Sequence, residues 1–249
     1  MSDGPQEDMR GLQVRNLVKR FGRRTVVRGV DFDMHRGEIV GFLGPNGAGK
    51  TTVFYMIVGF ISPNMGQIYL DGANVTRYPM YRRARLGISY LPQEASIFRK
   101  LTVEQNVWAI LETRNDLSRK DKKAKLEELL EELGIEDNRK QKAYTLSGGE
   151  RRRTEIARSL AIEPKFLLLD EPFAGIDPIA VYDIKTIISD LSKKGIGVLL
   201  TDHNVRDTLE ITDRSYIIKD GEIVVAGNRE DVMQNEVARK VYLGESFQM

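Results

Sequence analysis

The stretch GPNGAGKTT, residues 44–52, constrains the fold of this chain more than any other part of its sequence. It matches G-x-x-x-x-G-K-[ST], follows the apolar run GEIVGFL and precedes an apolar helix expected over residues 50–58. Glycines let backbone N–H groups curl around a phosphate, and the helix N-terminus adds partial positive charge. A strand-to-helix turn without a ligand is the alternative, which this placement disfavours. The motif predicts a phosphate-binding loop.

Each position of this loop has an expected role in binding a nucleoside triphosphate. Lys50 would reach the β- and γ-phosphates, and the Thr51 hydroxyl would be a ligand of Mg²⁺. The other expected nucleotide-binding positions of the loop are Gly44, Pro45, Asn46, Gly47, Ala48, Gly49 and Thr52. By itself the loop leaves kinases, GTPases and motor ATPases open.

Two acids end the apolar run FLLLDEP, residues 166–172. A run that is apolar on both faces suits a buried central strand, whose carboxyl end lies at the ligand edge of a parallel sheet. We expect Asp170 to hold Mg²⁺ directly or through water, and Glu171 to polarise the attacking water. His203 follows the next apolar run and would reach the same edge. The alternatives are surface salt bridges for the acids and a structural role for the histidine.

The stretch LSGGE, residues 146–150, combines a helix start with two glycines. Ser147 and Glu150 fit a capping box, which requires no glycine between them. Gly148 and Gly149 each cost about 0.5–1 kcal/mol relative to alanine in a helical turn. A phosphate that approaches the helix end closely would explain the glycine pair, because only a backbone without side chains permits that approach.

Three arginines at residues 151–153 follow the glycines directly. A solvated helix face is the default interpretation of such a run. Successive helical residues are about 100° apart, so the three side chains cannot all contact one phosphate. We expect at least one of them to brace a contact with a second subunit or with a partner.

Composition excludes several classes of protein. The 249 residues are 41% hydrophobic and 30% charged, which suits a globular fold with a sizeable core. A net charge of +2 gives no indication of a nucleic-acid partner. The absence of cysteine excludes disulfides and a zinc ribbon and is compatible with a reducing cytoplasm. No secretory signal is apparent, and the uncharged stretch 51–70 is interrupted by polar residues, so membrane contact is expected only through partners.

Strand-like and helix-like runs alternate along most of the chain, which predicts a mainly parallel sheet with helices on both faces. Alternating patterns in LQVRNL and VDFDM predict an additional antiparallel layer, and Asp220-Gly221 predicts a hairpin turn. The expected divisions are a nucleotide-binding core with its β layer over 11–93 and 156–228, a helical subdomain over 94–155, a helical tail over 229–249 and a flexible start over 1–10.

Taken together, these motifs resemble the ATP-binding subunits of ABC transporters over the whole chain. The matching positions are residues 44–52 for Walker A, Gln93 for the Q-loop, LSGGE for the signature, 166–171 for Walker B, Asp177 for the D-loop, His203 for the switch histidine and Phe21 for the aromatic that stacks on adenine. The resemblance implies an α/β fold with a RecA-like core, an antiparallel β layer and an inserted helical subdomain.

The resemblance also implies a catalytic arrangement. Two copies would pair head-to-tail, with each ATP between one phosphate loop and the partner's Ser147, Gly148, Gly149 and Glu150. Asp177 would contact the other subunit. Glu171 would be the base, with Lys50, Gln93 and His203 as further catalytic groups. The ligands of Mg²⁺ would be Thr51, Gln93 and Asp170.

Within that family the chain looks most like the ATPase of the lipopolysaccharide exporters of Gram-negative bacteria. The signature ends in Glu150 rather than the commoner Gln and is followed by RRR, which favours this group. That resemblance implies a subunit on the cytoplasmic face of the inner membrane, docked beneath two transmembrane permease subunits. The residues expected to line the partner groove are Phe54, Tyr55, Ala95, Ser96, Ile97 and Phe98. For Phe54 and Tyr55 the alternative is packing of the helix on the sheet.

Two other functions stay open on the sequence. The ATPases of branched-chain amino-acid importers have similar motifs and C-terminal endings like RKVYLGESF. A soluble ABC ATPase acting on DNA or ribosomes is disfavoured, because such proteins generally carry two cassettes or long insertions. Here there is one phosphate loop and a net charge of only +2.

Overall fold

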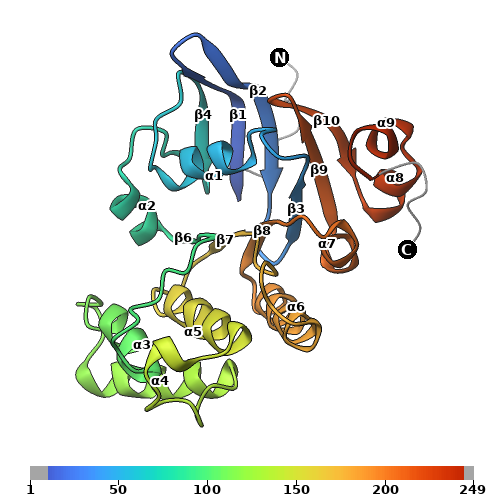
Figure 1. Ribbon diagram of the computed structural model, residues 1–249. Coiled ribbons are helices and arrows are strands. Elements are labelled where there is room, and N and C mark those ends of the chain that lie inside the picture. The colour runs from blue at the N-terminus through green and yellow to red at the C-terminus, as the bar shows by residue number, and fades with distance from the viewer. Residues whose placement is uncertain (1–10, 244–249) are drawn as a thin grey trace.

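A six-stranded sheet forms the centre of the computed structural model, which describes residues 11–243 (Figure 1). Its strand order is β10-β9-β3-β8-β7-β6, with all neighbours parallel except the β9–β10 hairpin. The strands are β3 (Ile39–Leu43), β6 (Ile88–Leu91), β7 (Phe166–Asp170), β8 (Gly197–Thr201), β9 (Arg214–Lys219) and β10 (Glu222–Gly227).

The apolar runs of the sequence occupy the middle of this sheet. Every residue of β3, β7 and β8 is buried, because helices or a second layer cover both faces of these strands. Their carboxyl ends meet at one edge, where the phosphate loop, Asp170 and His203 follow them. The predicted mainly parallel core is therefore confirmed.

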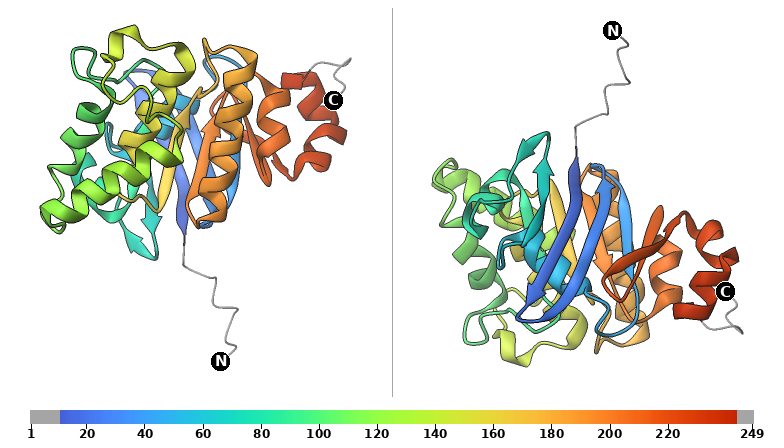
Figure 2. Two further views of the ribbon diagram at one scale, coloured as in Figure 1. Left: turned by 90° about the horizontal axis from the view of Figure 1, so that it is seen from below. Right: turned by 90° about the horizontal axis from the view of Figure 1, so that it is seen from above.

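A four-stranded antiparallel sheet makes the second layer, with the order β2-β1-β4-β5. Its strands are β1 (Leu12–Phe21), β2 (Arg24–Met34), β4 (Met65–Leu70) and β5 (Ala73–Asn74). Helix α1 (Lys50–Val58) lies between the two sheets, and its apolar residues join them in one core (Figures 1 and 2). This layer and helix match the sequence prediction.

Helices cover the opposite face of the central sheet. The helices next to the strands are α5 (Gly148–Leu160) and α6 (Pro178–Lys193), and α3 (Val103–Leu111) and α4 (Arg119–Glu132) pack against α5. The short 3₁₀ segment η1 (Ala143–Thr145) precedes α5. The helices α3, α4 and α5 group together at the bottom of Figure 1 and share a second core with the sheet. The division expected after residue 155 falls inside α5, which belongs to both the helical group and the sheet.

The C-terminal part packs beside the β9–β10 hairpin (Figure 2). It consists of α7 (Val205–Ile211), α8 (Arg229–Gln234), α9 (Glu236–Ala238) and the π-helical segment η2 (Arg239–Leu243). Asp220 and Gly221 both have positive φ, as the expected two-residue hairpin turn requires. The predictions for residues 1–10 and for the last part of the tail, 244–249, lie outside the described residues. Within the described range, no helix is both long enough and apolar enough to cross a membrane.

A buried arginine connects α1 to α2 (Met80–Leu86). The Arg83 side chain is 2% exposed and donates to the carbonyls of Met56 and Ile57, at 2.6 and 2.7 Å. It also donates to the carbonyls of Thr76 and Tyr78. Because the last carbonyls of a helix have no partner within it, Arg83 satisfies the C-terminal end of α1. Burial lowers its pKa to about 10, so the guanidinium stays charged at neutral pH.

We expect Arg83→Met to lower the free energy of unfolding by about 2–4 kcal/mol, because four carbonyls lose their donor inside the protein. Urea denaturation followed by circular dichroism measures this change. Arg77→Met, at an exposed position of the same region, is the matched control and should change stability by less than about 0.5 kcal/mol. Equal stability of the two variants would contradict the assigned role of Arg83.

Candidate active site

The phosphate loop leaves β3 through a glycine that tolerates no side chain. A Cβ on Gly44 would lie 2.1 Å from the carbonyl oxygen of Ile218 in the neighbouring strand. Gly49 ends the loop at the N-terminus of α1 with φ of 111°, which a residue with a side chain rarely adopts. The loop is therefore fixed by the packing of glycine backbone against the sheet, a constraint in addition to the phosphate contact for which the glycines were expected.

Lys50 lies within the curve of this loop. Its ammonium donates to the carbonyls of Gly44 and Pro45, at 2.7 and 3.2 Å. Burial lowers the pKa of Lys50, and the nearby carboxylates of Glu171 and Asp170 oppose that shift. The negative charges of these acids favour the protonated form of Lys50.

Asp170 is buried at the carboxyl end of β7, where several groups hold it in place. The hydroxyl of Tyr90 donates to its Oδ2 at 3.2 Å, and the side chain of Thr51 lies close to it. Burial raises the pKa of Asp170, and its interactions with Tyr90 and Thr51 partly offset the rise. Carboxylate and hydroxyl oxygens are the ligands that Mg²⁺ prefers, so the contact of Asp170 with Thr51 fits a magnesium site.

Glu171 occupies a strained position next in the chain. Its φ of 48° is left-handed, a conformation that costs non-glycine residues about 1–3 kcal/mol. Its carboxylate accepts a hydrogen bond from Nε2 of Gln93 at 2.5 Å and lies 2.5 Å from Nε2 of His203. Burial raises the pKa of Glu171, and His203 opposes the rise. The predicted base, Q-loop glutamine and switch histidine are thus in direct contact, although they come from three separate segments.

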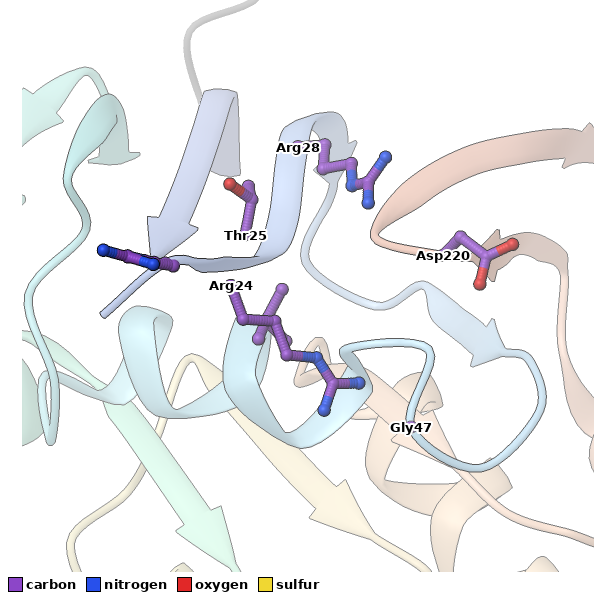
Figure 3. Close-up of a pocket in the computed structure, with 7 residues that line it drawn as sticks. Arg24, Thr25, Arg28, Gly47 and Asp220 are labelled. Carbon is purple, nitrogen blue, oxygen red and sulfur yellow. The ribbon is translucent and has the colours of Figure 1, made fainter. Parts of the chain in front are cut away.

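A cavity of about 540 Å³ lies between the phosphate loop and the side chains of Gln93, Glu171 and His203. Its lining consists of Arg24, Val26, Asn46, Gly47, Gly49, Lys50, Thr51, Thr52, Gln93, Glu171 and His203. An adjoining cavity of about 680 Å³ shares Arg24, Val26 and Gly47 with it and extends along the β1–β2 hairpin (Figure 3). The volume and the basic lining suit a nucleotide with its phosphates at the loop.

The residues near the expected adenine position differ in part from the prediction. Phe21 is 51% exposed at the end of β1 and lies outside the lining of the two cavities. Arg23, Arg24 and Arg28 line the second cavity, and Figure 3 shows the side chains of Arg24 and Arg28 beside Gly47 and Asp220. The sequence motifs did not predict that these arginines line the site. The basic stretch FGRR, residues 21–24, was the available signal for two of them. The stacking role of Phe21 stays a prediction.

The signature segment forms the expected capping box. Glu150 N–H donates to the Ser147 hydroxyl at 3.3 Å, and Ser147 N–H donates to the Glu150 carboxylate at 2.8 Å. A Cβ on Gly149 would lie 2.6 Å from Cβ of Ala180, and one on Gly148 would lie 3.2 Å from the carbonyl oxygen of Gly175. Packing of α5 against the start of α6 therefore requires the second glycine. None of the four signature residues 147–150 lines the cavity at the phosphate loop of the same chain.

Arg152, the middle arginine of the run, points into the protein. Its side chain is 5% exposed and donates to the carbonyls of Pro92, Asp170, Glu171 and Pro172, at 3.0–3.3 Å. It also pairs with Glu155 at 3.3 Å. Arg152 therefore joins the signature helix to both the Q-loop and the end of β7, a role that the charge run gave no reason to expect. The predicted contact with a second subunit or a partner remains open for Arg151 and Arg153.

The remaining predicted positions fall into two groups. Asp177 is exposed and caps α6, where its carboxylate accepts from the N–H groups of Ile179 and Ala180. Tyr55, Ala95 and Phe98 are exposed and Ser96 is partly exposed, as a partner groove requires.

Two groove predictions are wrong. Phe54 is fully buried between the sheets, against Phe42 and Tyr90, and Ile97 is buried in the helical core. A side chain covered by its own chain cannot contact a partner.

Known proteins are similar to this chain in sequence and in fold. A family model described as ABC transporter matches residues 27–174. The chain belongs to the ABC transporter family.

Relatives in this family align with almost all of the chain. It is 54% identical over 238 residues to a Haemophilus influenzae protein named lipopolysaccharide export system ATP-binding protein LptB, covering 96% of this chain and 99% of the relative. It is 52% identical over 241 residues to the Escherichia coli K12 protein of the same name, with 97% and 100% covered. A probable ABC transporter ATP-binding protein of Azorhizobium caulinodans is 58% identical over 233 residues, with 94% and 83% covered.

Solved structures have the same fold. The crystal structure of an ATP-binding cassette of an ABC transporter, MJ1267 in its ADP conformation, aligns with a TM-score of 0.84 and 28% identity. The alignment covers 94% of this chain and 99% of that one. The predicted fold class of an ABC ATPase is confirmed.

We expect Arg152→Lys to lower ATP turnover by about tenfold or more, because a lysine cannot hold the Q-loop and the end of β7 at once and small displacements of catalytic groups are costly. ATP binding, which depends on the phosphate loop, should change by less than about threefold. Steady-state hydrolysis and titration with a fluorescent ATP analogue measure the two effects.

Arg151→Lys is the matched control. Arg151 directly precedes Arg152 in α5, and its side chain is only half-buried. The variant should retain turnover. Equal losses in the two variants, or full activity of Arg152→Lys, would contradict the bracing role.

Proposed function

We propose that this chain is the ATP-hydrolysing subunit of a lipopolysaccharide exporter, which supplies the energy to move lipopolysaccharide from the inner membrane toward the outer membrane. The observation that carries the proposal is the identity of 52–54%, over nearly the whole chain, to relatives named for lipopolysaccharide export. The contacts of Glu171 with Gln93 and His203, and the electrostatic effect of Glu171 and Asp170 on Lys50, support the ATPase chemistry.

The residues of the site divide the chemical work among them. Lys50 and the N–H groups of the phosphate loop bind the phosphates of ATP and stabilise charge that develops on them. Glu171 takes a proton from the attacking water, and Gln93 and His203 hold its carboxylate in position. Asp170, Thr51 and Gln93 would hold Mg²⁺, which neutralises phosphate charge when bound. The raised pKa of Glu171 suits a base, since it strengthens proton uptake.

A second copy of the chain completes the site in this proposal. The cavity contains no donor from residues 147–150, so the face of the bound γ-phosphate opposite Lys50 would need groups from outside the chain. The exposed N-terminus of α5 in another copy offers the Ser147 hydroxyl and backbone N–H groups. A head-to-tail homodimer would place Asp177 and the exposed Ile179 close to the contact.

Two transmembrane permease subunits would bind next to the Q-loop. Arg158 holds this surface together, because it donates to the Ser96 carbonyl at 2.7 Å and lies 4.3 Å from the ring of Phe98. The surface is connected to the active site through Glu155, which accepts from Ser96 N–H and pairs with Arg152. The chain would then be a peripheral protein on the cytoplasmic face of the inner membrane.

Detergent extraction of the tagged chain from membranes of its own cells tests the proposal. We expect two permease subunits of the lipopolysaccharide exporter to copurify, as identified by mass spectrometry. Phe98→Asp should lose them, because it places a charge on the proposed partner surface, while ATP turnover of the isolated chain should stay within about twofold.

Val224→Asp, at an exposed apolar position on the outer strand β10, is the matched control and should retain both partners. Amino-acid permease subunits in the eluate would contradict the assignment to lipopolysaccharide export and favour an importer.

A further inference from the structure

The C-terminal segment reaches back to the edge of the sheet where the nucleotide site lies. Tyr242, in η2, packs against the small core formed by Leu43, Leu209, Ile217 and their neighbours. Leu43 is the last residue of β3 and directly precedes the phosphate loop. The segment that contains Tyr242 is therefore fixed against the base of that loop.

The hydroxyl of Tyr242 lies between two loops of the nucleotide site. It donates to the backbone carbonyl of Asp202 at 3.1 Å, one residue before His203. The backbone of Gly44, the first residue of the phosphate loop, lies close to the same hydroxyl and opposes the rise of its pKa. Burial raises the pKa of Tyr242 to about 12, so the hydroxyl keeps its proton at neutral pH. One neutral side chain thus packs against the core that contains Leu43, directly before the phosphate loop, and hydrogen-bonds to the loop that carries His203.

Asp202 passes this restraint on to the catalytic groups. Its buried carboxylate accepts from the N–H of Phe173 at 3.0 Å and from the N–H of Asn204 at 2.9 Å. Phe173 lies two residues after Glu171, and Asn204 directly follows His203. The ring of His203 is exposed and contacts the carboxylate of Glu171. Its position therefore depends on the backbone on either side of it.

We propose that Tyr242 is a positioning residue for ATP hydrolysis, which fixes the loop of His203 relative to the phosphate loop and makes the C-terminal segment part of the nucleotide site. This inference rests on the proposed roles of Glu171, His203 and the phosphate loop. Tyr242 acts through its hydrogen bond to the backbone of Asp202 and through the packing of its ring against the core that contains Leu43.

Tyr242→Phe removes the hydroxyl and keeps the ring in the small core. Hydrogen exchange of the full chain without nucleotide should show the N–H groups of Phe173 and Asn204 exchanging about threefold to tenfold faster, as expected for the loss of one hydrogen bond. Exchange in α8 should not change, because the ring still packs. ATP turnover should fall by a similar factor. Tyr69→Phe, which removes a hydroxyl bonded to Gln67 on β4, is the matched control and should change neither quantity.

A second comparison separates positioning from a general loss of folded protein. In the His203→Ala background, Tyr242→Phe should reduce the residual turnover by a smaller factor than in the wild type, because residues that act through one another are not additive. Equal factors in the two backgrounds would contradict the proposal.

Unchanged exchange at Phe173 and Asn204 would overturn it, as would faster exchange confined to residues 229–238. A wild-type chain without turnover would contradict the proposed function instead. The exchange measurement would still decide the role of Tyr242.

Discussion

The contact of Glu171 with Gln93 and His203 is the interaction on which the rest of the site depends. A carboxylate at the end of a fully buried strand, in a left-handed conformation, is held only because its neighbours satisfy both of its oxygens. The strain and the burial of charge are costs that a purely structural acid would not need to bear. They are consistent with a base whose carboxylate must point into the cavity beside Lys50.

Long polar side chains connect the catalytic site to three distant parts of the chain. Arg152 links the end of β7 to the signature helix and the Q-loop, Arg158 and Glu155 extend that link to the exposed Phe98, and Tyr242 adds the C-terminal segment. Each link includes a side chain that hydrogen-bonds to the backbone of another segment. A displacement of any one segment would therefore change the geometry of the catalytic groups directly, without rearrangement of the sheet.

Patterns of apolar residues and glycines predicted the two sheets, helix α1 and the phosphate loop, because buried strands and left-handed turns leave strong local signals. The directions of long polar side chains left none. Arg152 looked like one of three solvated arginines, and Phe54 looked as available as Tyr55, since helical position alone does not say which face another layer covers. Tyr242 lies far along the chain from Asp202, so no short motif contains both. The glycine pair at residues 148–149 was assigned to a phosphate alone, whereas Gly149 is also required by contact with Ala180.

Because contact with Ala180 already explains Gly149, this glycine is not by itself evidence for a second copy at the site. Cross-linking of two chains tests the head-to-tail site directly. The chain has no cysteine, so Asn46→Cys and Ser147→Cys can each be made as a single-cysteine chain in a Glu171→Gln background. The measurement is treatment of the mixed variants with a short thiol cross-linker, with and without ATP. We predict a cross-linked pair of chains in the mixture with ATP and in neither variant alone. Absence of that pair, when both variants bind ATP, would contradict the head-to-tail site.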